Sequence, residues 1–170
     1  FPAAVSLLEY AALCVPVSHG ARTVSSWSDA LEAALREHDH ILIPASAEPY
    51  FFHRTVVIPS CRYLECAPNA TLAETVLFRN AHIVDGTHIP EDAQEIPRDH
   101  DIYLTGGRFV DPHLSRAGYG SSGMLDPADY AAHFHGVSTM LFFNHTDRLY
   151  ISGTTFVHCA AFAVQCGDIV

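Results

Sequence analysis

The chain has 170 residues, 49% of them apolar and 16% charged, which is enough for one folded domain with a core. Nine basic residues against 19 acidic ones give a net charge of −10, which argues against nucleic acid or an anionic membrane surface as a partner. The apolar stretch Leu7–Val17 is interrupted by Glu9 and Pro16 and is too short to span a membrane. We expect no membrane partner. A secreted or periplasmic location is favoured over a cytoplasmic one.

The first predicted element is an amphipathic helix that follows Ser26. Ser26-Trp-Ser-Asp has the spacing of a capping box. Apolar residues then recur at helical spacing, at Trp27, Ala30, Leu31, Ala34 and Leu35. We expect Leu31 and Leu35 to pack onto the first part of the fold that follows.

After this helix the sequence predicts only strands and turns. Ile41-Leu42-Ile43-Pro44 and Val56-Val57-Ile58-Pro59 each read as a short buried strand that ends at proline. Further apolar segments of three or four residues follow, with Gly, Asn, Asp or Pro between them. Strands this short favour a solenoid over a sandwich.

Two internal alignments suggest a repeat. Asp101–Asp111 aligns without gaps on Arg148–His158, an offset of 47 residues, and each copy has a tyrosine between apolar residues, then a glycine and a phenylalanine. We expect the two tyrosines, Tyr103 and Tyr150, to stack in register on the outside or in a neighbouring groove. A second match, Leu141 on Phe162, has an offset of 21 residues. Together they indicate coils of about 21–24 residues.

Two segments are predicted to be surface loops. Asp85–Asp99 is acidic and contains two prolines, and Asp111–Gly136 is rich in Gly, Ser and Pro. The second is longer than a connection between solenoid strands requires, and long loops on rigid scaffolds often bind ligands. We expect it to form one wall of a groove.

The helix at Trp27–Leu35, the strand at Ile41–Pro44 and the two aligned copies resemble the pectate-lyase-like superfamily, in particular polygalacturonase-type glycoside hydrolases. The resemblance covers about residues 22–170. It implies an all-β fold, a right-handed parallel β-helix with an N-terminal capping α-helix. The chain would be a single domain over residues 1–170, with a cap at about 1–60 and the first coils at about 61–170.

The resemblance also implies that catalytic residues of the polygalacturonase type lie on later coils. The Asn-x-Asp, Asp-Asp and Gly-His-Gly motifs of that family do not occur in this sequence. We therefore expect a fragment of a longer chain, with no glycanase activity of its own. Asp147 and Asp168 are the candidate catalytic carboxylates, because the 21-residue offset would place one above the other. The alternative is that both cap solenoid turns.

Candidate substrate-binding residues are histidines and an aromatic residue in or near the long loop, namely His113, Tyr119, His133, His135 and His158. His133 and His135 could instead be metal ligands, but no supporting Cys or carboxylate spacing accompanies them, so we predict no metal and no cofactor. Arg108, Arg116 and Arg148 are candidates for binding uronate carboxylates. The five cysteines are expected to be mostly buried free thiols, with a Cys61–Cys66 bridge as the alternative.

The functional prediction is a polysaccharide-degrading glycoside hydrolase that cleaves a carbohydrate substrate with general acid and general base carboxylates. The candidate arginines would favour a substrate that contains uronate. One alternative is a polysaccharide lyase on the same fold, in which calcium or arginine neutralises the uronate. Another is a non-catalytic glycan-binding β-helix of the adhesin or tailspike kind. The sequence leaves the oligomeric state open.

Overall fold

The computed structural model describes residues 1–19, 21–73, 78–82, 97–110, 139–157 and 162–169. Two helices and twelve strands lie in these residues. In chain order they are β1 (Val5–Ser6), the 3₁₀ helix η1 (Leu7–Leu13), β2 (Val15–His19), β3 (Arg22–Ser26), α1 (Ser28–Glu37), β4 (His40–Ile43), β5 (Tyr50–Phe51), β6 (Val56–Ile58), β7 (Arg62–Ala73), β8 (Phe78–Asn80), β9 (Asp99–Val110), β10 (Thr139–Ser152), β11 (Thr155–Val157) and β12 (Phe162–Ile169). None of the described helices is long and apolar enough to cross a membrane.

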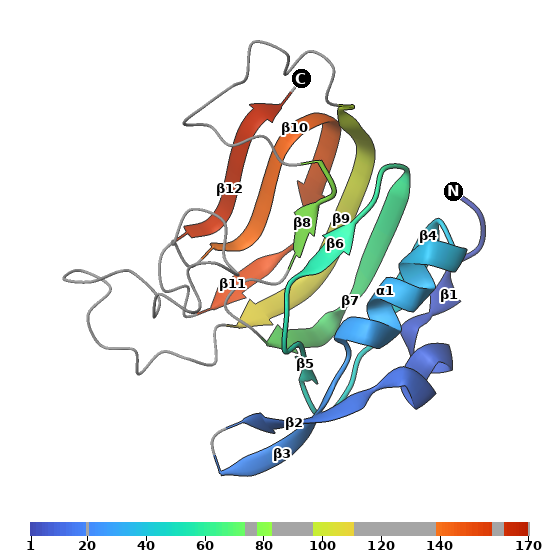
Figure 1. The fold of residues 1–170 in the computed structure, drawn as a ribbon, viewed down its shortest axis with the longest axis vertical. Helices are drawn as coiled ribbons and strands as arrows, with labels where there is room; N and C mark the ends of the chain where they lie inside the picture. The colour runs from blue at the N-terminus through green and yellow to red at the C-terminus, as the bar shows by residue number, and fades with distance from the viewer. Residues whose placement is uncertain (20, 74–77, 83–96, 111–138, 158–161, 170) are drawn as a thin grey trace, which may run out of the picture.

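The strands form one curled sheet in which every pairing is parallel except that of β2 with β3 (Figure 1). The long strands β7, β9 and β10 bend and thereby contribute to more than one face. Face A contains β1, β4, the starts of β7 and β9, and the end of β10. Face B contains β3, β5, the ends of β7 and β9, and β11. Face C contains β6, β8, the start of β10, and β12. The structure confirms a mostly β, largely parallel architecture.

The 47-residue repeat is confirmed by the strand register. Ile102 pairs with Leu149, Tyr103 with Tyr150 and Leu104 with Ile151, each 47 residues apart. Phe109 pairs with Phe156 at the same offset on face B. The 21-residue repeat is wrong, because Leu141 pairs with Val164, 23 residues later.

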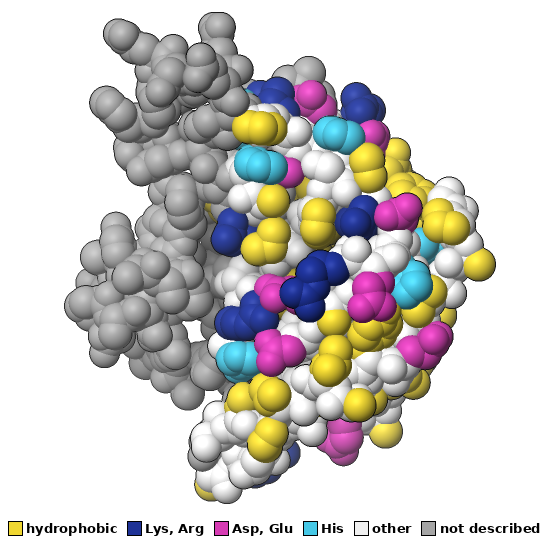
Figure 2. Space-filling model, turned by 45° about the vertical axis from the view of Figure 1, so that its right-hand side comes forward, with side chains coloured by type: hydrophobic (Ala, Val, Ile, Leu, Met, Phe, Trp, Pro, Cys, Tyr) yellow, Lys and Arg dark blue, Asp and Glu magenta, His cyan; other side chains and the backbone are white. Residues whose placement is uncertain are grey.

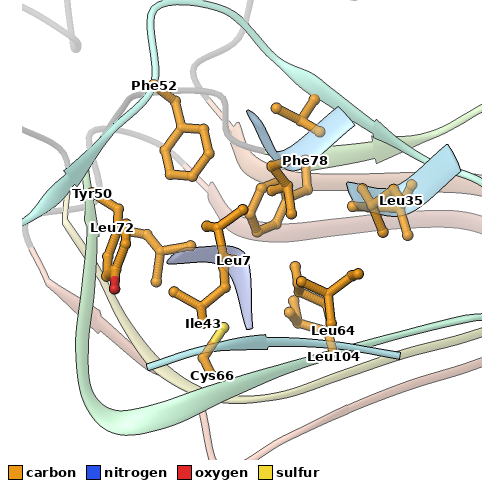
Figure 3. Close-up of a cluster of buried hydrophobic side chains, with 14 of the residues drawn as sticks. Leu7, Leu35, Ile43, Tyr50, Phe52, Leu64, Cys66, Leu72, Phe78 and Leu104 are labelled. Carbon is orange, nitrogen blue, oxygen red and sulfur yellow. The ribbon is translucent and has the colours of Figure 1, made fainter. Parts of the chain in front are cut away.

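The inner side of the curled sheet is filled by aliphatic and aromatic side chains (Figure 3). Ile102, Leu104 and Phe109 are buried as predicted, and their partners Leu149, Ile151 and Phe156 are partly buried against the same core. Phenylalanines stack along the interior, with centroids 5.8 Å apart for Phe52–Phe78, 5.9 Å for Phe78–Phe109 and 5.5 Å for Phe109–Phe156. The sequence analysis missed η1, whose Leu7 is fully buried in this core.

Helix α1 packs against η1, β4 and β6, at the end of the sheet where the first strands of faces A and C lie (Figure 1). Leu31 and Leu35 are buried, as predicted. The predicted capping box is wrong, since Trp27 is the N-cap and makes no side-chain cap bond. The Ser26 hydroxyl instead contacts the His53 ring, at 2.6 Å from Nδ1, and so links the helix start to the chain after β5.

Candidate functional site

Three tyrosines on neighbouring strands lie side by side on the outer side of face A. Tyr63 of β7, Tyr103 of β9 and Tyr150 of β10 are register partners. Their ring centroids are 6.2 Å apart for Tyr63–Tyr103 and 6.0 Å apart for Tyr103–Tyr150. The predicted stacking of Tyr103 and Tyr150 is confirmed, and we call the three residues the tyrosine ladder.

Other rings extend the tyrosine ladder at one end. The His40 ring stacks on Tyr63 with centroids 4.3 Å apart and planes 13° apart. Phe1 contacts both Tyr63 and Tyr103, at 5.3 and 5.0 Å. At the other end Tyr150 is 53% exposed, so its ring is open to a ligand.

Polar groups border the tyrosine ladder on both sides. Glu65, Thr105 and Ser152 lie two residues further along the same strands and therefore on the same face. The Tyr63 and Thr105 hydroxyls are 3.0 Å apart, and a Glu65 oxygen lies 2.9 Å from His40 Nε2. On the opposite side Arg148 donates two hydrogen bonds, of 2.6 and 2.7 Å, to the Asp101 carboxylate.

Ion pairing accounts for many charges of the described surface. Arg148 and then His100 hold the pKa of the Asp101 carboxyl well below its usual range. Arg54 binds both Asp29 and Glu32, and Arg62 binds Asp39. Figure 2 shows acidic and basic side chains next to one another, with histidine and hydrophobic side chains between them. An aromatic strip with charged and hydroxyl groups along its edges can stack on a sugar ring and hydrogen-bond its hydroxyls.

A groove of about 400 Å³ near the β2–β3 hairpin is a second candidate for ligand binding. Trp27 and Tyr50 line it with rings that meet edge to face, 5.0 Å apart. Arg22 and Glu48 supply charges at its wall. The Tyr50 hydroxyl donates a hydrogen bond to the Pro44 carbonyl. The Tyr50 ring therefore forms part of the groove wall, while its hydroxyl already has a partner within the fold.

The predicted pairing of Asp147 with Asp168 is not supported by the register. Asn144 pairs with Gly167 and Thr146 with Ile169, so Asp168 lies opposite His145 rather than Asp147. Asp147 accepts a 2.5 Å hydrogen bond from Arg98 Nε. The backbone of Asp168 lies in β12, but its side chain is outside the part of the chain whose side chains the structure describes.

The predicted substrate-binding residues His113, Tyr119, His133, His135 and His158 lie outside the described residues, as does the loop Asp111–Gly136. Their roles stay predictions. Of the candidate arginines, Arg108 is exposed, Arg148 is paired with Asp101, and Arg116 lies outside the described residues. The Cys61–Cys66 bridge is wrong, since both are free, and burial raises the pKa of the Cys66 thiol.

The sequence analysis missed the third tyrosine of the ladder. Arg62-Tyr63-Leu64-Glu65 has the same Tyr-aliphatic pair as Ile102-Tyr103-Leu104 and Leu149-Tyr150-Ile151. That shared pair was a usable signal, although the surrounding residues differ too much for a gap-free alignment.

Two solved structures match this chain over 91% of its length. One is the crystal structure of PfbA, a surface adhesin of Streptococcus pneumoniae, with a TM-score of 0.55 and 17% identity. The other is a structure of the same pneumococcal surface protein and adhesin, with a TM-score of 0.56 and 16% identity. The likeness is one of fold.

This chain spans only about a third of those structures, 33% and 35% of their lengths. No known family matches the sequence, and no curated protein matches it either. The comparisons therefore support the curled, largely parallel sheet, and they do not support the specific resemblance to polygalacturonase-type enzymes.

Proposed function

We propose that this chain is part of an extracellular right-handed parallel β-helix that binds glycan through the tyrosine ladder without cleaving it. The observation that carries the proposal is the in-register row of Tyr63, Tyr103 and the half-exposed Tyr150, bordered by polar side chains. The adhesin fold of PfbA supports binding over catalysis by analogy. The β-helix part of the proposal is supported by paired strands that lie 22 or 23 residues apart along the chain, as for Tyr50 with Leu72 and His40 with Tyr63.

The chemistry of the described carboxyl groups favours binding over hydrolysis. A glycosidase needs a general acid with a raised pKa and a second carboxylate at a set distance from it. Beside the tyrosine ladder, Arg148 shifts the pKa of Asp101 downward, and Glu65 is bound to His40. With its pKa lowered, Asp101 is suited to accepting hydrogen bonds rather than to donating a proton.

The test measures binding of defined oligosaccharides, neutral and uronate-containing, by the whole chain and by Tyr150→Ala. Losing one stacked ring should weaken binding about tenfold, which corresponds to about 1.4 kcal/mol. Leu13→Ala is the matched control, because Leu13 is an exposed hydrophobic residue of η1, 46% exposed, away from the tyrosine ladder. It should bind as the unaltered chain does.

Two outcomes would contradict the proposal. Equal binding by Tyr150→Ala and the unaltered chain, together with loss in Arg22→Ala, would move the site to the groove beside β3. Release of new reducing ends from polygalacturonate or another glycan would show that the chain cleaves its ligand.

A further inference from the structure

A corner of the curled sheet next to the tyrosine ladder brings together a second set of residues. Cys61, Asp101 and Arg148 each lie one residue before the register trio Arg62, Ile102 and Leu149. All three have left-handed backbone angles, with φ of 58°, 55° and 59°. The same unusual backbone conformation on neighbouring strands makes this corner a regular stack.

The side chains of Cys61, His100 and Asp101 converge at this corner. The Cys61 sulfur lies 3.6 Å from His100 Nδ1, and Asp101 Oδ2 lies 3.0 Å from the same nitrogen. The three ligand atoms all lie within 4.8 Å of one another. A thiol, an imidazole and a carboxylate are the three side-chain types that bind Zn²⁺ in proteins.

The distances between the three ligand atoms are close to the ligand–ligand distances of a tetrahedral zinc site. With Zn–S of about 2.3 Å and Zn–N and Zn–O of about 2.0–2.1 Å, tetrahedral angles require S···N of about 3.6 Å and N···O of about 3.3 Å. The observed separations to His100 Nδ1 are 3.6 and 3.0 Å. An ion at the centre needs shifts of a few tenths of an ångström at His100. Because the sulfur and the carboxylate oxygen lie within 4.8 Å of each other, they need to approach by at most about 1.2 Å.

The backbone holds these groups in place while leaving them accessible. The Cys61 amide donates to the His100 carbonyl at 2.9 Å, and the His100 amide donates to the Ser60 hydroxyl at 3.1 Å. Cys61 is exposed, and the His100 and Asp101 side chains are 44% and 29% exposed. A metal ion can therefore reach the cluster from solvent.

We propose that Cys61, His100 and Asp101 bind one Zn²⁺ ion, with a fourth position left open to water or to a ligand group. The lone pair of His100 Nδ1 binds the ion while Nε2 carries the imidazole proton, and the Cys61 thiol proton is released to solvent as the metal–thiolate bond forms. This site goes beyond the proposed glycan binding and does not require it, although Asp101 and Arg148 also border the tyrosine ladder.

Arg148 opposes the ion, because its guanidinium binds both Asp101 oxygens. The Arg148 side chain is 63% exposed and can swing into solvent, leaving Asp101 Oδ2 to the metal. Arg148→Gln should therefore bind Zn²⁺ more tightly than the unaltered chain. Weaker binding in this variant would overturn the competing role of Arg148.

The test titrates the reduced whole chain with Zn²⁺ by calorimetry and with Co²⁺ by absorbance, which reports a metal–thiolate bond as an ultraviolet charge-transfer band. One ion per chain and a thiolate band are expected. Cys61→Ser and His100→Gln should weaken binding at least about tenfold, and Cys61→Ser should also lose the band. Asp101→Asn should weaken it while keeping the fold, since Asn tolerates a left-handed φ.

Cys166→Ser is the matched control, since Cys166 is an exposed free thiol outside the cluster. It should keep both the affinity and the band, and circular dichroism should show each variant folded. Absence of binding to the unaltered chain, or a thiolate band that survives in Cys61→Ser, would overturn the proposal.

Discussion

Asp99 is almost fully buried, yet its carboxylate has a complete set of partners. It accepts hydrogen bonds from Ser60, from the Asn80 side chain at 2.8 Å and from the His82 amide at 2.6 Å, and His82 Nδ1 lies 2.9 Å away. Burial opposes ionisation, but the hydrogen bonds from His82, Asn80 and Ser60 outweigh it and lower the pKa. The charged carboxylate thus links the start of β9 to β8, to His82 just after β8, and to Ser60 between β6 and β7.

Asp99→Asn should destabilise the chain by about 1–3 kcal/mol at pH 7, because an amide can accept on only one atom and its NH₂ would face donors. The lowered pKa means that the stabilisation is present above the unfolded value of about 3.9 and is lost as the pH falls through the folded value. The difference between variant and unaltered chain should therefore shrink on acidification, as measured by urea unfolding at several pH values. A difference that is constant with pH would contradict a charged Asp99.

Asp39→Asn is the control for this measurement. Asp39 is a surface partner of Arg62, with its side chain 56% exposed, and surface pairs contribute at most about 1 kcal/mol. Its effect on the urea midpoint should be small at every pH.

Single residues also show why the sequence predicted part of the site and missed the rest. Tyr103 and Tyr150 could be paired because each lies in a copy of one repeat. Cys61 and His100 are in contact although 39 residues separate them, and the segments around them share no pattern. Contacts of that kind depend on the lengths of intervening loops, which residue patterns do not specify.

At the scale of elements, the two repeat offsets show when a hydrophobic pattern determines register. The Asp101–Asp111 copy includes glycines at fixed places, and Gly106 and Gly153 both have left-handed φ, of 71° and 64°. By contrast Met140–Phe143 is buried at every position, so the apolar pattern there has no period of two. A slip of two residues, from 23 to 21, leaves each side chain on the same side of the sheet, and the pattern cannot detect it.

Gly106 lies where β9 bends from face A to face B, and Gly153 is the equivalent glycine after β10. Alanine at each position tests how strongly this corner depends on glycine. A Cβ on Gly106 would lie 2.0 Å from the Cys66 carbonyl oxygen, whereas the nearest atom to a Cβ on Gly153 would be 3.6 Å away. Gly153→Ala should cost about 1–2 kcal/mol from its left-handed φ alone. Gly106→Ala should cost clearly more, because backbone must also move, and thermal unfolding of the two variants measures the difference. Equal losses would show that the corner relaxes freely.

At the scale of the whole molecule, the described strands contact chiefly their neighbours along the stack. β7 lies between β4 and β9 on face A, β9 lies between β7 and β10, and β12 pairs with β10. Stability in such an arrangement is close to a sum over coils and their interfaces. The two ends of the described chain should therefore respond separately to a local change.

Phe156→Ala tests this separation. Phe156 packs on Phe109 at one end of the interior phenylalanine stack, 5.5 Å between centroids, while Leu31 is fully buried at the α1 end. Removing the Phe156 ring should cost about 2–3 kcal/mol, less than the roughly 3–5 kcal/mol of a fully buried phenylalanine, because Phe156 is only partly buried. If each strand is coupled only to its neighbours in the stack, amide hydrogen exchange should speed up in β10, β11 and β12 and stay unchanged in β4 and the start of β7.

Leu31→Ala should produce the reverse pattern. Uniform acceleration through all of the described strands in either variant would show that the curled sheet unfolds as one cooperative unit.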